Sequence, residues 1–153
     1  MKRKALLVLG LAVALTCTNV VSVYAAEGEN YSIETYSNNN NKVVATGSEQ
    51  TDITGDVSVT GNDETAVKTS DNAKVSVKGN VSADGNNTYG VRSTDNSSVS
   101  VQGNVSASGE SAEGVASRGN SSVKVSADVT AEGGITPSGV DAGKGSSVTG
   151  DGT

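Results

Sequence analysis

A 24-residue repeat runs through most of this chain and limits the folds open to it. The segment Asn72–Ala83 recurs as Asn96–Ala107 and as Asn120–Ala131, with valine and alanine in the same places. A weaker copy covers Ser48–Val59, and a fifth begins at Gly145 and contains only its first strand. Repeats of this length indicate stacked units that bury their apolar side chains only against their neighbours.

Each repeat contains three short segments in which apolar and polar residues alternate. In the third unit these are Val99–Gln102, Val105–Ser108 and Val115–Arg118, separated by glycine. Alternation with a period of two is typical of β-strands that have one buried face and one face in water. The predicted inward positions form five columns: Thr51, Val75, Val99, Val123; Ile53, Val77, Val101, Val125; Val57, Val81, Val105, Val129; Val59, Ala83, Ala107, Ala131; and Val67, Val91, Val115, Val140.

Glycines also recur in phase and mark the corners between these strands. One set precedes Asp or Asn (Gly55, Gly79, Gly103), and a second set follows the next strand (Gly61, Gly85, Gly109, Gly133). Glycine provides the positive φ of a tight turn, and Asn and Asp tolerate it. Three strands and three corners per repeat predict an all-β parallel β-solenoid, a β-helix-like coil whose rungs are about 4.8 Å apart. The fourth unit is one residue longer, and a loop at 133–139 is expected to absorb the insertion.

Two other structures are compatible with the composition. A chain rich in Gly, Ser and Asn with few aromatic residues is typical of disorder, and short alternating strands also build β-sandwiches or hairpin arrays. The fixed phase of Val-x-Val and Val-x-Ala across four units favours the solenoid over both.

The first 26 residues predict a secretory signal peptide. Lys2, Arg3 and Lys4 precede an apolar run, and small residues at Val23 and Ala25 suit cleavage after Ala25, with Ala26 as the alternative site. The run is too short and its flank too polar for a stable membrane span. The single cysteine, at position 17, lies in this segment and does not match a lipid-attachment sequence, so the mature chain has no thiol for disulfides or metal ligation.

We therefore expect three regions: 1–26 as the signal peptide, 27–42 as a leader or an N-terminal cap and linker, and 43–153 as about four and a half repeats. Within the second region, Tyr31–Thr35 suits a capping strand and Asn38–Asn41 a polar linker. Because the last unit is incomplete, the sequence predicts a fragment of a longer protein. Its open strand edges predict end-to-end self-association.

The net charge of the chain bears on which binding partners are expected. Three of the 11 basic residues lie in the predicted signal peptide, so the mature chain has eight basic residues and 17 acidic ones. A net negative chain is not expected to bind nucleic acid, and once the signal is removed no stable membrane span is predicted.

No catalytic, cofactor-binding or metal-binding residue is predicted, and the chain is not expected to be an enzyme. Histidine is absent, and Asp84, Asp95, Asp128 and Asp141 occupy different phases of the repeat. The alternative is a truncated piece of a glycan-acting β-helix enzyme, which would need carboxylates that converge in a groove.

Three short segments near corners offer oxygen ligands for calcium: Gly61–Glu64, Asp84–Asn87 and Gly150–Gly152. None has the spacing of a known calcium loop, so solvated turns are the prediction. The outward pairs Ser58/Thr60, Ser82/Asp84, Ser106/Ser108 and Thr130/Glu132 are too irregular for an ice-binding lattice. Most of the six Asn-x-Ser/Thr matches are expected at corners: Asn30, Asn80, Asn86, Asn96, Asn104 and Asn120.

The segment Gly90–Gly109 and its copies resemble the β-strand repeats of bacterial extracellular and cell-surface proteins, the adhesin-like and autotransporter-passenger class. The resemblance covers about 43–153 and implies a secreted or surface-exposed structural scaffold. It also implies extracellular glycans, or components of a host or cell surface, as partners. The end of the signal, Tyr24–Glu27, is similar to that of Gram-positive secreted proteins. The sequence contains neither a translocator barrel nor a wall-sorting signal, so the resemblance leaves the means of surface attachment open.

Overall fold

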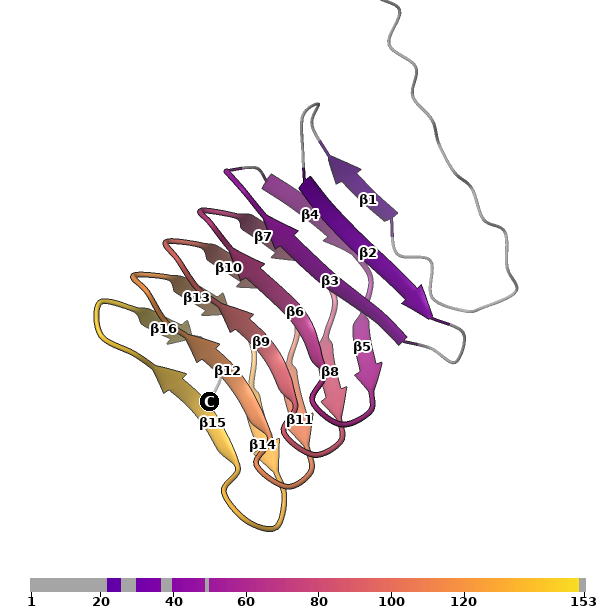
Figure 1. Ribbon diagram of the computed structural model, residues 1–153, viewed down its shortest axis with the longest axis vertical. Coiled ribbons are helices and arrows are strands. Elements are labelled where there is room, and N and C mark those ends of the chain that lie inside the picture. The colour runs from indigo at the N-terminus through magenta and orange to yellow at the C-terminus, as the bar shows by residue number, and fades with distance from the viewer. Residues whose placement is uncertain (1–21, 26–29, 37–39, 49, 152–153) are drawn as a thin grey trace, which may run out of the picture.

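The computed structural model describes residues 22–25, 30–36, 40–48 and 50–151, and these form a three-sided coil of β-strands (Figure 1). Sheet A contains β1 (Ser22–Ala25), β4 (Gln50–Thr54), β7 (Lys74–Val77), β10 (Ser98–Val101), β13 (Ser122–Val125) and β16 (Ser147–Gly150). Sheet C contains β5 (Val57–Thr60), β8 (Val81–Asp84), β11 (Val105–Ser108) and β14 (Val129–Glu132). Sheet B contains β2 (Asn30–Tyr36), β3 (Asn40–Thr46), β6 (Thr65–Ser70), β9 (Tyr89–Ser93), β12 (Glu113–Ser117) and β15 (Ser138–Ala142).

Strands of successive repeats pair in parallel and in the predicted register. Val99 lies between Val75 and Val123 in sheet A, and the same offset of 24 residues holds in sheet C. Between β12 and β15 the offset becomes 25, with Val115 opposite Val140, so the extra residue is accommodated in the loop before β15. The predicted fold class, an all-β parallel β-solenoid with three strands per rung, is confirmed.

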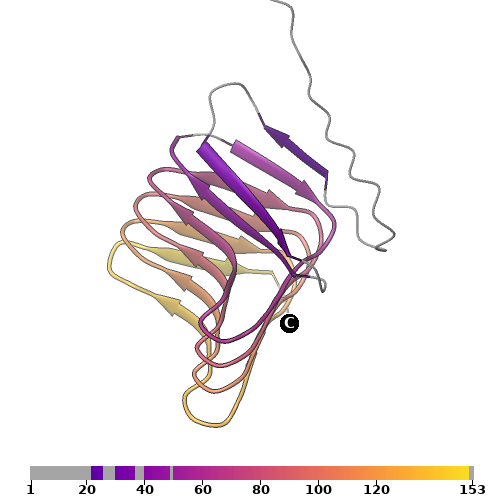
Figure 2. The same cartoon turned by 45° about the vertical axis from the view of Figure 1, so that its right-hand side comes forward.

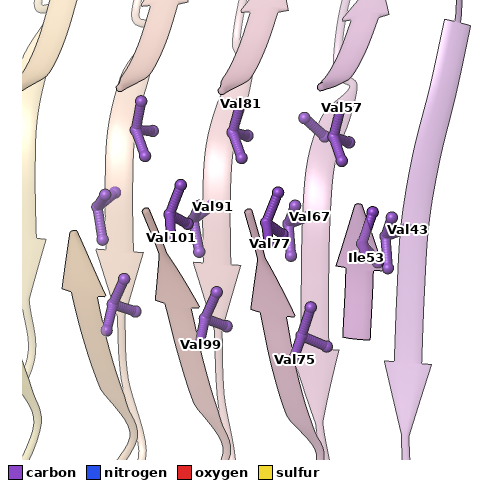
Figure 3. Packing of buried hydrophobic residues seen from close by; sticks show 14 of the residues in the cluster. Val43, Ile53, Val57, Val67, Val75, Val77, Val81, Val91, Val99 and Val101 are labelled. Carbon is purple, nitrogen blue, oxygen red and sulfur yellow. The ribbon is translucent and has the colours of Figure 1, made fainter. Parts of the chain in front are cut away.

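The inward side chains form one continuous apolar core along the coil axis (Figure 3). Valines of the middle rungs are fully buried, including Val77, Val91 and Val101 at 0% exposure. Side chains in the last rung are less covered, because no strand lies beyond β14, β15 and β16 in the described chain. Val129 is only partly buried, and Val140 is 48% exposed.

The third strand of each rung departs from the predicted alternation. Gly90 and Val91 are both buried although they are consecutive, and so are Ala66 and Val67. A side chain at Gly90 would point inward, since a Cβ there would lie 2.6 Å from Cγ1 of Val105. Two consecutive positions of β9 therefore face the interior, and only a very small residue fits at the first of them.

Polar side chains also occupy this interior, at positions that the five predicted columns did not include. Thr69, Ser93 and Ser117 occupy the same position of the third strand in successive rungs, and each is 0% exposed. The Thr69 hydroxyl donates to Oγ of Ser93 at 2.9 Å, and the Ser117 hydroxyl donates to the carbonyl of Ser121 at 3.0 Å. Because these hydroxyls are paired, burying them costs little.

The expected positive φ holds for some of the corner glycines, including Gly55 at 101°, and not for others. Gly109 has φ of 125° and uses the freedom that glycine has there. Gly103 does not have a positive φ; a Cβ at this position would lie 2.6 Å from the carbonyl oxygen of Gly79 one rung below. The corner between the second and third units contains no glycine, and Asp95 and Asn96 adopt positive φ there instead.

Antiparallel strands cover the N-terminal end of the coil (Figure 2). The segment Tyr31–Thr35 lies in β2, which pairs antiparallel with β3, and β3 in turn pairs in parallel with β6. Residues 40 and 41 of the expected linker belong to β3, whereas residues 38 and 39 lie outside the described residues. The side chain of Asn41 covers the edge of β5, accepting from the amide of Ser58 at 2.6 Å and donating to the carbonyl of Asp56 at 2.9 Å.

β1 pairs antiparallel with the outer edge of β4, and its residues lie at the end of the predicted signal peptide. The rest of that segment, 1–21 and 26, lies outside the described residues. Cleavage after Ala25 would remove β1 and leave the backbone groups of the β4 edge unpaired. No helix in the described part of the chain is long and apolar enough to cross a bilayer.

Candidate binding surfaces

Four carboxylates considered for catalysis lie on different parts of the coil. Asp84 ends β8 on sheet C, and Asp141 lies in β15 on sheet B. Asp95 and Asp128 occupy two different corners. Because glycoside hydrolysis needs two carboxylates flanking one bond, this arrangement assembles no such pair from the four.

Corner oxygens are used in hydrogen bonds between rungs. Oδ1 of Asp56 accepts from the amide of Asn80 at 2.7 Å, Oδ1 of Asn80 accepts from Asn104 at 2.9 Å, and Oδ1 of Asn104 accepts from Asp128 at 3.1 Å. A second ladder runs through Asn86, whose Oδ1 accepts from the amide of Glu110 at 3.1 Å.

These ladders include two of the segments considered for calcium. Asn62 and Asn86 take part in one ladder, with Oδ1 of Asn62 accepting from the amide of Asn86 at 3.0 Å. Glu64 forms an ion pair with Lys42 at 3.5 Å. Among the residues that the structure describes, no group of three acidic, His or Cys side chains is placed to hold a metal ion. The third segment, Gly150–Gly152, extends beyond the described residues.

The outward face of sheet C presents mixed hydroxyls and carboxylates. Ser58, Ser82, Ser106 and Thr130 form one row, as the strand register requires. The neighbouring row contains Asp84 and Glu132, and Oγ of Ser108 donates to Oδ1 of Asp84 at 2.7 Å. This face is therefore polar and carries negative charge.

The outward face of sheet B contains a charged patch, which we define as Lys68, Tyr89, Arg92, Glu113, Arg118 and Asp141. The guanidinium of Arg92 lies 5.1 Å from the centre of the Tyr89 ring, and Arg118 forms an ion pair with Asp141. Burial raises the pKa of the Glu113 carboxyl, and repulsion from Asp141 adds to this, against the opposing effect of Arg118 and Arg92. Its Oε2 atom is buried without a hydrogen-bond partner. Much of the charge in this patch is already paired internally.

Sheet A has a concave outward face. A shallow groove of about 330 Å³ crosses β4, β7, β10, β13 and β16, and so follows the coil axis. We call this the sheet A groove. It is lined by Gln50, Lys74, Ser76, Ser98, Ser100, Ser122, Lys124, Ser147 and Thr149, with Val75, Val99 and Val123 between them.

The sequence reasoning named no site residue and missed this groove. The signal was present in the outward positions of the first strand, where Lys74, Ser98, Ser122 and Ser147 share one phase. The inward columns do not indicate the groove, because its concave shape depends on how the strands curve.

Comparison of the chain with protein-family models, with curated proteins and with solved structures finds no match. The class of protein is therefore stated from the fold alone: this chain is a three-sided parallel β-solenoid of 24-residue repeats.

Proposed function

We propose that this protein is a secreted or surface-exposed bacterial scaffold, without catalytic activity, that contributes to adhesion or spacing through many weak contacts. Extracellular glycans, or components of a host or cell surface, are its partners. The observation that carries this proposal is the repetition of the outward side chains: each rung presents hydroxyls in the same places, as in the row of Ser58, Ser82, Ser106 and Thr130. Regular rows on a rigid coil repeat one weak contact several times, and repeated contacts add avidity.

Three further features support the proposal. The predicted signal peptide and the Gram-positive style of its ending support export. The mature chain has no cysteine that needs a defined redox state. Its acidic charge suits a soluble extracellular chain and disfavours nucleic acid. End-to-end self-association of the coil through its strand edges would lengthen the scaffold.

The location is tested by expressing the chain in a Gram-positive host and treating intact cells with protease. We expect the protein in the medium or in the fraction cleaved from the cell surface. Recovery of an uncleaved, protected protein in the cytoplasm would contradict the proposal. The purified protein is then screened against a panel of glycans for adhesion and for the release of reducing ends or unsaturated uronates. Adhesion without turnover is expected, whereas turnover would favour the alternative of a glycan-acting β-helix enzyme.

A further inference from the structure

Resting on the proposed function, we propose that the sheet A groove binds an extended acidic polysaccharide whose chain runs parallel to the coil axis. The groove crosses five consecutive strands of one sheet, so any extended ligand in it contacts the same position of each repeat in turn. Its volume of about 330 Å³ lies within the range of small-ligand sites.

The charge of the groove selects the sign of the ligand. Lys74 and Lys124 are the charged residues in its lining. This contrasts with a chain that has 17 acidic residues against 11 basic ones. The nearest carboxylates flank the groove: Asp52 follows Ser76 at the β4 end of the same row, where it accepts from the side-chain amide of Gln50 at 3.2 Å. Lys124 pairs with Asp151 at 3.4 Å, but both side chains are more than half exposed (57% and 56%), so the pair is weak and gives way to a better anion.

The hydroxyls of the groove select the kind of anion. Ser76, Ser98 and Ser100 are half-buried, and none of these hydroxyls is engaged by another group in the part of the chain that the structure describes. Each hydroxyl is both a donor and an acceptor, as a sugar hydroxyl is. The rows repeat every ~4.8 Å along the axis, and one pyranose ring is about as long as one rung is tall. Successive sugar units of an extended polysaccharide can therefore lie opposite successive rows of hydroxyls.

The other two faces suit such a ligand less well. Sheet C carries Asp84 and Glu132, which would repel an anion. The charged patch of sheet B also contains cations, Lys68 and Arg92, but Arg92 lies over the Tyr89 ring, Arg118 pairs with Asp141, and Glu113 adds a second carboxylate. The groove is thus the face where two lysines lie beside rows of unpaired hydroxyls.

The test is titration of the secreted full-length product with a uronate hexasaccharide, followed by NMR and calorimetry. We expect binding at millimolar concentrations, with shifts at Ser98 and Ser100, and binding that weakens as salt is added. The same hexasaccharide with every carboxylate methyl-esterified should bind at least about fivefold more weakly, because the two ion pairs are lost.

Matched variants localise the ligand. Lys74→Gln and Lys124→Gln should each weaken binding about two- to fivefold, and Ser100→Asp should weaken it further by placing a carboxylate in the groove. Lys78→Gln makes the same change in net charge one residue after the end of β7, outside the groove lining, and should change affinity less than about twofold. Circular dichroism verifies that each variant is folded.

Three results would overturn the inference: no binding of the acidic hexasaccharide, equal binding of the esterified form, or equal effects of Lys78→Gln and Lys124→Gln. Adhesion to neutral glycans with any of these results would reject the groove assignment and leave the proposed scaffold function standing. Cytoplasmic location or turnover would reject the scaffold function itself.

Discussion

Replacing Val101 by aspartate tests the inward columns at their most enclosed point. Val101 is 0% exposed and lies in register between Val77 and Val125. The change loses about 1.5–3 kcal/mol of apolar burial and adds the cost of a buried carboxyl without a partner, at least about 2 kcal/mol. The total of about 4 kcal/mol or more is a large part of the 5–15 kcal/mol that typically stabilises a domain.

Two controls separate burial from the introduction of charge. Ser100→Asp places the same carboxylate one residue earlier, on the outward face opposite Lys124, and should change the free energy of unfolding by no more than about 0.5 kcal/mol. Val140→Asp changes a valine of the predicted inward set that is 48% exposed, and should cost less than about 1 kcal/mol. Urea denaturation followed by circular dichroism gives all three values. Similar losses from Val101→Asp and Ser100→Asp would refute the assigned facing.

Three smaller changes test the corners and the charged patch. Gly109→Ala should lower the free energy of unfolding by about 1–3 kcal/mol, because φ is 125° and the added Cβ would clash with the backbone one rung below. Gly134→Ala, whose Cβ would have nothing within 4 Å, should lower it by less than about 0.5 kcal/mol. Equal melting temperatures of the two variants would contradict this. Asp56→Ala should lower the free energy of unfolding by about 1 kcal/mol because it removes the acceptor for the Asn80 amide, and Asp56→Asn, which keeps an oxygen there, should lower it less. Denaturation curves that order the two the other way would reject the ladder. Burial raises the folded-state pKa of Glu113, so its ionised form opposes folding: Glu113→Gln should stabilise the chain at neutral pH, and the advantage should disappear below the ordinary value of 4.5. Unfolding curves against pH that stay parallel for the two proteins would contradict that sign.

The register of the stack was predictable because each column repeats one residue type at one spacing. Val75, Val99 and Val123 pair as the offset of 24 requires. A shift by one residue would place every valine of a strand in water, so the apolar pattern is sufficient to select this pairing.

The two consecutive buried positions in the third strand were not predictable from alternation. Alternation assumes that consecutive residues of a strand face opposite sides, but Gly90 and Val91 are both buried. The space that a Cβ would need is taken by Val105 from the neighbouring sheet. Only the three-dimensional packing of two sheets shows that constraint, although the small residues at Ala66, Gly90 and Gly114 share a phase in the sequence.

The sheet A groove was partly predictable. The lysines and serines at outward positions of the first strand can be read from the repeat, including Lys74, Ser98 and Lys124. Their arrangement around a concave surface depends on strand curvature, which the pattern of residue types does not specify.

Parallel stacking at an offset of 24 residues is tested most directly by a pair of engineered cysteines, with Cys17 replaced by serine. Ser98 and Ser122 are register partners in sheet A, so their Cα atoms lie about 4.8 Å apart, within the range that a disulfide spans. The pair Ser98→Cys and Lys124→Cys has almost the same sequence separation but lies diagonally across the strands, at about 8 Å. We predict nearly complete oxidation of the first pair and little of the second in the folded protein, with equal oxidation of both in urea. Equal oxidation of the two pairs without denaturant, or oxidation of neither, would contradict the parallel solenoid.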